Sequence, residues 1–178
     1  DISWMPMPDG EVNSLAVTED YVYLCGYFDE IGVSELHALA RIDKETGAPD
    51  ETWSPQEIPW ASTLAADANN LYVGCAQQRL ASAQTDFYLH RFGLESGQMD
   101  TNWNPRVVGT VFGIALDEQN VYAAGAITRV DGVLRKGLAR IGKASGAVDA
   151  AWRADADDLA LTIVPSSDGI YVVGDLTH

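Results

Sequence analysis

The most regularly spaced charged residues are an arginine and an aspartate that recur together three times. The aspartate follows the arginine by nine residues each time: Arg41 and Asp50, Arg91 and Asp100, Arg140 and Asp149. A guanidinium can bind a carboxylate through two parallel hydrogen bonds, so these residues could contribute to a ligand site or form structural ion pairs. Because the spacing is constant, we expect one structural pair per repeat, formed within a repeat or between neighbouring repeats.

The other side chains that could support catalysis form no recognisable motif. The histidines are His37, His90 and His178. The chain has no Gly-x-Ser-x-Gly, no P-loop and no zinc-finger spacing. Asp155, Asp157 and Asp158 could offer oxygens to calcium, but the glycine and distal glutamate of an EF-hand loop are missing. We interpret these aspartates as a solvated acidic turn, and we assign no catalytic, cofactor-binding or metal-binding residue and no cofactor.

The segments that carry the arginines and aspartates belong to a longer internal repeat. The phrase ARIDKETGAPDETWSP, at residues 40–55, returns as HRFGLESGQMDTNWNP and again as ARIGKASGAVDAAWRA. Three further columns keep steps of 49, 50 and 49 residues: Trp4, Trp53, Trp103 and Trp152; Tyr23, Tyr72, Tyr122 and Tyr171; Leu15, Leu64, Ile114 and Ile163. Several independent columns in one phase indicate a true repeat.

The repeat length and the local patterns predict an all-β protein. Short β-rich runs such as VNSLAVTE and YVYLCGYF are separated by polar turns, and no window has a long helical period with caps. We expect a β-propeller, or a segment of one, with four-stranded blades and a repeat of about 49–50 residues. Residues 1–178 then form one propeller segment, with repeats at 4–52, 53–102 and 103–151 and a partial repeat at 152–178 (repeats 1 to 4).

The number of repeats predicts that the propeller is incomplete. Repeat 4 stops at GDLTH, which matches GYFDE of repeat 1. Propellers close at about four to eight blades, so three and a half repeats leave two open apolar faces. We expect this chain to be a segment of a larger propeller, or to be completed by another protein chain.

Two stretches of the sequence resemble the delta-sixty repeat family of bacterial β-propellers. They are GYFDEIGVSELHALARIDKETGAPDETWSP in repeat 1 and GAITRVDGVLRKGLARIGKASGAVDAAWRA in repeat 3. The shared pattern is Gly-x-Phe, a later glycine, Leu-Ala-Arg, Thr-Gly, an aspartate, and an aromatic residue followed by proline. Repeat 2 departs most, because Cys75 replaces the glycine that repeat 1 has at Gly26. The resemblance implies a propeller fold, often in large secreted or cell-surface proteins, and implies no single activity.

The charge of the chain restricts its partners. Acidic residues outnumber basic ones by 26 to 11, which gives a net charge of −15. Such a surface repels phosphates and anionic lipids, and no apolar run approaches the roughly 20 residues of a membrane span. We therefore expect no nucleic acid partner and no membrane insertion. Residues 1–52 carry a net −10 and residues 103–151 a net +2, which indicates either solvated loops or a directed interaction surface.

These observations favour a non-catalytic β-propeller module of an extracellular or cell-surface protein, used for binding or assembly. Its partner would be the rest of a larger propeller, another protein chain or a glycan. The alternative is a propeller enzyme with an axial site, either a quinoprotein-like oxidoreductase or a glycan-active enzyme. Converging histidines, arginines and carboxylates at the axis would favour the enzyme, and a filled or polar axis would favour the module.

The two cysteines, Cys25 and Cys75, occupy neighbouring columns of repeats 1 and 2. An oxidising compartment would permit a disulfide between them. Packed sheets lie about 10 Å apart, however, while a disulfide needs Cα atoms within roughly 7 Å. The sequence leaves two alternatives, a bridge or two buried small hydrophobic residues.

Overall fold

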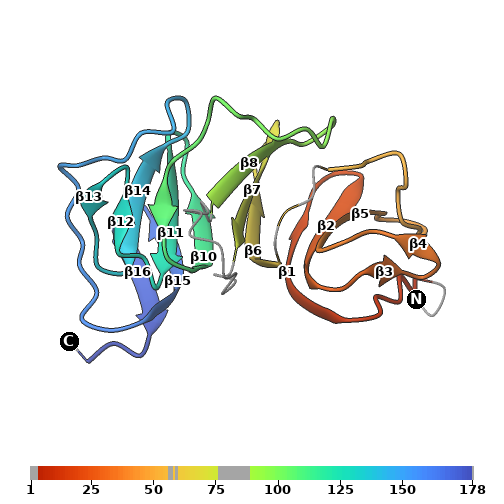
Figure 1. The fold of residues 1–178 in the computed structure, drawn as a ribbon, viewed down its shortest axis with the longest axis horizontal. Coiled ribbons are helices and arrows are strands. Elements are labelled where there is room, and N and C mark those ends of the chain that lie inside the picture. The colour runs from red at the N-terminus through yellow and green to blue at the C-terminus, as the bar shows by residue number, and fades with distance from the viewer. Residues whose placement is uncertain (1–3, 56–57, 59, 76–88, 178) are drawn as a thin grey trace, which may run out of the picture.

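The computed structural model describes residues 4–55, 58, 60–75 and 89–177, and these residues form strands, turns and loops without a helix. Four antiparallel sheets follow one another along the chain, one in each repeat (Figure 1). Repeats 1 to 3 each have three paired strands: β1 (Glu11–Val17), β2 (Tyr21–Tyr27) and β5 (Leu39–Asp43); β6 (Ala61–Ala66), β7 (Asn70–Cys75) and β8 (Leu89–Gly93); β10 (Val111–Leu116), β11 (Asn120–Gly125) and β14 (Leu138–Gly142). Repeat 4 has two: β15 (Ala160–Ser166) and β16 (Gly169–Gly174).

Short strands form two smaller sheets beside the main ones. In repeat 1, β3 (Glu30–Ile31) pairs with β4 (Ser34–Glu35). In repeat 3, β12 (Arg129–Val130) pairs with β13 (Val133–Leu134) and with β9 (Val107–Val108). The two hairpins occupy the same place in their repeats, between the second and third strands of the main sheet.

The first strand of every repeat contains one irregularity at the same position. The register shifts between Val12 and Ser14 in repeat 1, and equally at the matching positions of the other three repeats. A bulge of this kind bends a strand and increases its twist. The repeat seen in the sequence therefore extends to the fine geometry of the backbone.

The fourth strand expected in each repeat is not formed. The segment after the third strand makes one isolated bridge per repeat, Ile42 with Pro49 in repeat 1 and its counterparts in repeats 2 and 3. The next residue, Asp50, ends the strand pairing. Its Oδ1 accepts the backbone N–H of Thr52 at 2.9 Å, and this hydrogen bond turns the chain. Trp53 therefore lies just after a turn and on no strand.

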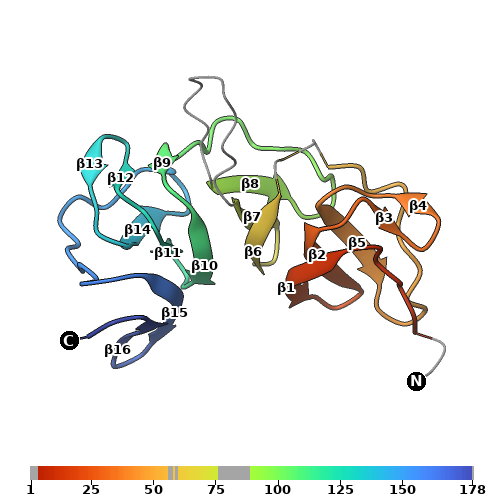
Figure 2. The same ribbon diagram turned by 60° about the horizontal axis from the view of Figure 1, so that its bottom comes forward.

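The four sheets stand side by side in an arc. Figure 2 shows β1, β6, β10 and β15 on the concave side of the arc, with the second and third strands farther out. Each of these first strands contacts the first strand of the next repeat. Both faces of β2, β7 and β11 are almost entirely buried. β7 and β11 lie between two neighbouring sheets, whereas the outer face of β2 is covered by Phe28, Ile31 and Leu36 of its own repeat. The last second strand, β16, alternates between exposed and half-buried residues.

Cys25 and Cys75 are both fully buried, and neither forms a disulfide. They belong to the same apolar cluster, which extends from repeat 1 into repeat 3. Of the two alternatives left by the sequence, the structure has two buried small hydrophobic residues. Burial raises the pKa of each thiol to about 12, so neither is ionised near neutral pH.

The thiols give a first testable prediction. At pH 8 the folded protein should react with a thiol reagent slowly or not at all, because both sulfurs are buried and protonated. After unfolding without reductant, two thiols per chain should react at once. Unfolded protein that titrates with no thiols would contradict the free state of the cysteines.

Candidate functional site

The recurring tryptophans join neighbouring repeats. The Trp53 ring lies edge-on to Tyr23 of repeat 1, with ring centroids 5.4 Å apart, and its indole Nε1 donates to the carbonyl of Leu94 in repeat 2 at 3.0 Å. Trp103 does the same one repeat later, against Tyr72 and the carbonyl of Gly142. Trp53 and Trp103 are 1% and 2% exposed, so the two tryptophans occupy equivalent buried sites.

The recurring glycines complete these contacts from the other side. Gly97 has a positive φ of 66°, and a Cβ placed on it would lie 3.2 Å from Trp53 Nε1. Gly146 and Gly47 stand in the same relation to Trp103 and Trp4. A glycine is needed here both for the left-handed backbone and for the close approach of the indole.

The recurring arginines and aspartates form one ion pair within each of the first three repeats, as expected. In repeat 1, Arg41 Nε and Nη2 both donate to Asp50 Oδ2, at 3.0 and 2.5 Å. The guanidinium also lies over the ring of Trp53, 5.6 Å from its centroid. Burial alone would raise the pKa of Asp50, but the hydrogen bonds from Thr52 and Arg41 hold it below its usual value.

The side chains common to all repeats are thus used for packing. The tyrosine and the arginine of one repeat both contact the tryptophan of the next repeat, and the glycine turn of that next repeat closes over the indole. The arginine–aspartate spacing had two interpretations, a ligand site or structural ion pairs. The pairs are structural, and a functional surface must come from residues that differ between repeats.

The concave strands carry a nearly uncharged surface. Glu11 is the one ionisable side chain in β1, β6, β10 and β15, all four of which are fully described. Asn13 Nδ2 donates to the carbonyl of Ala61 at 3.0 Å, and Ser62 Oγ donates to that of Val111. The matching positions in repeats 3 and 4 are Phe112 and Leu161, which are 37% and 42% exposed. The concave side therefore changes from amide and hydroxyl groups to apolar side chains along the arc.

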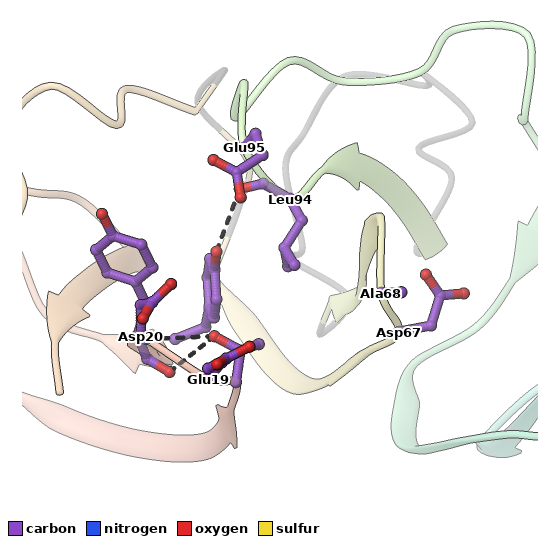
Figure 3. A pocket seen from close by; sticks show the side chains of 9 residues that line it. Glu19, Asp20, Asp67, Ala68, Leu94 and Glu95 are labelled. Carbon is purple, nitrogen blue, oxygen red and sulfur yellow. Dashed lines mark hydrogen bonds between the residues drawn. The ribbon is translucent and has the colours of Figure 1, made fainter.

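A pocket lies between the turns of repeats 1 and 2 (Figure 3). Glu19 and Asp20 lie on one side of it, Leu94 and Glu95 on another, and Asp67 with its neighbour Ala68 on a third. Carboxylates dominate the lining, so the pocket would attract a cation or a basic group.

The pocket exists because repeat 2 lacks a lysine at this place. At the next interface, Lys143 occupies the position of Leu94, and its Nζ forms a 3.1 Å ion pair with Asp67. Burial opposes ionisation of Asp67, but the backbone N–H of Asn69 and the Lys143 ammonium hold its pKa below the usual value. Repeat 1 has Thr18 in place of that aspartate. The ion pair is thus replaced by a hollow at the first interface.

The remaining candidate residues do not converge on a site. His37 Nδ1 lies 3.1 Å from Asp29 Oδ1 in an exposed loop, whereas His90 lies on β8 in another repeat. Asp157 accepts the backbone N–H of Thr177 at 3.1 Å. Within the described residues, no group of three or more histidines, cysteines or acids is placed to hold a metal ion. His178 and the loop at residues 76–88 lie outside the described residues.

These features define an all-β repeat protein whose antiparallel sheets are joined by a repeated aromatic contact. Among solved structures, the chain is similar to the crystal structure of the computationally designed Ika4 protein. The identity is 13%, the TM-score is 0.57, and the match covers 96% of each chain. At this identity the likeness concerns the fold alone. No model of a known protein family and no curated protein matches the chain. The described residues also contain no helix that is long and apolar enough to cross a membrane.

Proposed function

We propose that this chain is a segment of a β-propeller that acts as a non-catalytic module for binding or assembly. Support comes from the arrangement of the sheets, in which each first strand contacts the first strand of the next repeat along one side of an arc. Radially arranged sheets with their first strands innermost are typical of propellers. The extracellular or cell-surface location in this proposal rests on the resemblance to the delta-sixty repeats.

The observation that carries the non-catalytic role is the composition of the concave strands. An enzyme with an axial site needs acids, bases or metal ligands that converge there. The four concave strands supply Glu11 alone, and they otherwise supply amide, hydroxyl and apolar groups. Such a surface suits an uncharged partner, such as a glycan or a neutral protein segment, better than it suits acid–base chemistry.

The hairpins that differ between repeats supply the second part of the proposed binding surface. Val33, at the tip of the β3–β4 hairpin, is 96% exposed, and Leu134 in the matching hairpin of repeat 3 is 66% exposed. The first hairpin carries Glu30 where the second carries Arg129. Exposed, variable loops on a rigid scaffold are where binding residues concentrate.

Ring closure tests the propeller. Two copies joined in tandem by a short glycine–serine linker should close into one compact ring, because the second copy follows the first without a search for a partner. Small-angle scattering should then give a radius of gyration near the ~20 Å of a compact chain of that length. An extended particle, much larger than this, would indicate an open array of sheets and would contradict the proposal.

A second measurement tests whether the chain is catalytically inactive, as proposed. The chain and its Glu11→Gln variant should both be inactive in nitrophenyl glycoside hydrolysis and in dye-coupled alcohol oxidation with added quinone cofactor and calcium. Activity in the unchanged chain that the Glu11→Gln variant lacks would establish an axial catalytic group and overturn the proposed role.

A further inference from the structure

The two ends of the arc expose opposite faces of the same repeated interface. Tyr23, Tyr72 and Tyr122 each point toward the following repeat, and they are 1%, 0% and 5% exposed. Tyr171, the fourth member of the series, is 58% exposed. Val173 on the same face of β16 is also exposed, whereas its counterpart Cys25 is fully buried. The last sheet therefore presents the side chains that elsewhere insert into the next repeat.

The first sheet presents the surface that elsewhere receives the preceding repeat. Leu15 on β1 is 58% exposed, whereas Ile163, at the same position in repeat 4, is 1% exposed and packs with Tyr122 of repeat 3. Val17 is likewise 58% exposed. Trp4, Val17, Val22 and Lys44 surround a surface hollow on this face.

The chain itself shows what fills such a hollow. At the interface between repeats 1 and 2, the positions that match Trp4 and Lys44 are Trp53 and Leu94. The ring of Tyr23 lies against Trp53, and its hydroxyl donates to the carbonyl of Leu94 at 3.2 Å. At the next interface Tyr72 lies against Trp103 in the same way, 5.3 Å between centroids. A tyrosine from the preceding repeat is therefore the natural occupant.

We propose that copies of this chain associate head to tail, with Tyr171 of one copy seated in the hollow that Trp4, Val17, Val22 and Lys44 form on another. The Tyr171 ring packs against Trp4. Its hydroxyl, which donates to Asp168 Oδ2 at 3.1 Å in the single chain, donates instead to the Lys44 carbonyl, as Tyr23 does to Leu94. The proposal deepens the assembly role put forward above. Its occupant is a second copy because each chain carries both the inserted side chain and the hollow.

Ring formation follows from the symmetry of this contact. A head-to-tail interface forms a closed ring if the rotation between subunits closes, and an open filament if it does not. Each copy contributes one main sheet from each of its four repeats, so two copies bring together eight. That number is within the range of about four to eight blades. The outer edge of β16, which has no third strand beside it among the described residues, stays in contact with solvent and loses no hydrogen bonds to water.

Charge sets the conditions for this association. Each copy carries a net −15, so two copies repel one another at long range. Salt screens that repulsion but leaves the apolar contact intact. Association should therefore strengthen as the ionic strength rises from 0.05 to 0.5 M.

Complementary blocking variants test the proposal. Tyr171→Lys removes the inserted ring but keeps the hollow, whereas Val17→Lys obstructs the hollow but keeps the tyrosine. Both positions are exposed, so both variants should fold, and a circular dichroism melt checks this. Gln119→Lys makes the same charge change at an exposed position in the turn between β10 and β11 of repeat 3, away from both end faces. Sedimentation velocity should show association of the unchanged chain and of Gln119→Lys, and association weakened at least about tenfold in either blocked variant.

The decisive sample is an equimolar mixture of the two blocked variants. Each mixed pair has one intact tyrosine and one intact hollow, so the mixture should form a dimer of one chain of each kind and nothing larger. A chain that stays monomeric at high salt and high concentration would overturn the proposal, as would a mixture without mixed dimers. If separate copies fail to associate while the tandem chain closes, the self-association is wrong and the proposed propeller stands.

Discussion

Replacing Trp53 with alanine should lower the free energy of unfolding by about 3–5 kcal/mol. The indole is 1% exposed, lies between two repeats and donates to the carbonyl of Leu94. Its removal leaves a cavity at the interface, takes the edge-on contact from Tyr23 and removes one of the two donors to the Leu94 carbonyl, which keeps the Tyr23 hydroxyl. Urea unfolding followed by circular dichroism gives the free energy directly.

Trp60 provides the matched control for this change. It is the one tryptophan outside the repeat series, and it is 48% exposed. Trp60→Ala should cost far less than Trp53→Ala, because it loses an exposed contact with Tyr27 and opens no interface. Equal losses for the two variants would show that the repeated tryptophans do not hold neighbouring sheets together.

The sequence was sufficient to predict the repeated parts of this structure. The tyrosine, tryptophan, arginine and aspartate columns indicated a β-rich unit, and the nine-residue spacing predicted the ion pairs that the structure contains. The contact between each recurring glycine and a tryptophan was not apparent, although both residues recur in the repeated phrase. Gly97 and Trp53 lie at opposite ends of repeat 2, and the pattern does not show that the fold brings the two ends together.

Other features depend on three-dimensional packing and could not be predicted from patterns. The expected fourth strand is reduced to a bridge because a side-chain hydrogen bond of Asp50 turns the backbone, and a strand-like composition does not reveal that competition. The pocket beside Leu94 arises from the absence of a lysine that the next interface has. Likewise, the hollow next to Trp4 becomes visible only when the burial of equivalent positions is compared.

Removing the carboxylate of Asp50 should cost about 3 kcal/mol, the lower end of the range for breaking a buried ion pair. Arg41, its partner, has a side chain that is 7% exposed and already contains a buried Nη1 with no acceptor among the described residues. In Asp50→Ala the guanidinium keeps its charge and loses both hydrogen bonds, so the burial of that charge is no longer compensated.

The same substitution in the other repeats supplies a graded comparison. The arginine side chains are 7%, 15% and 30% exposed in repeats 1, 2 and 3. Water can solvate a more exposed guanidinium, so the loss should decrease from Asp50→Ala to Asp100→Ala and be smallest for Asp149→Ala. The reverse order would show that burial of the arginine does not determine the cost.

The pH dependence separates the charge of Asp50 from its role in the turn. Asp50→Asn keeps a side-chain oxygen for Thr52 but loses the negative charge. The folded-state pKa of Asp50 is lowered, so the stability due to the ion pair is fully present above the unfolded pKa of about 4 and is lost as the pH falls through the lower folded-state pKa. The stability difference between the unchanged chain and Asp50→Asn should therefore be constant from pH 5 to 7 and shrink below pH 4. A difference that stays constant down to pH 2 would show that it does not arise from ionisation of Asp50, and that the charge of this carboxylate contributes little to holding Arg41.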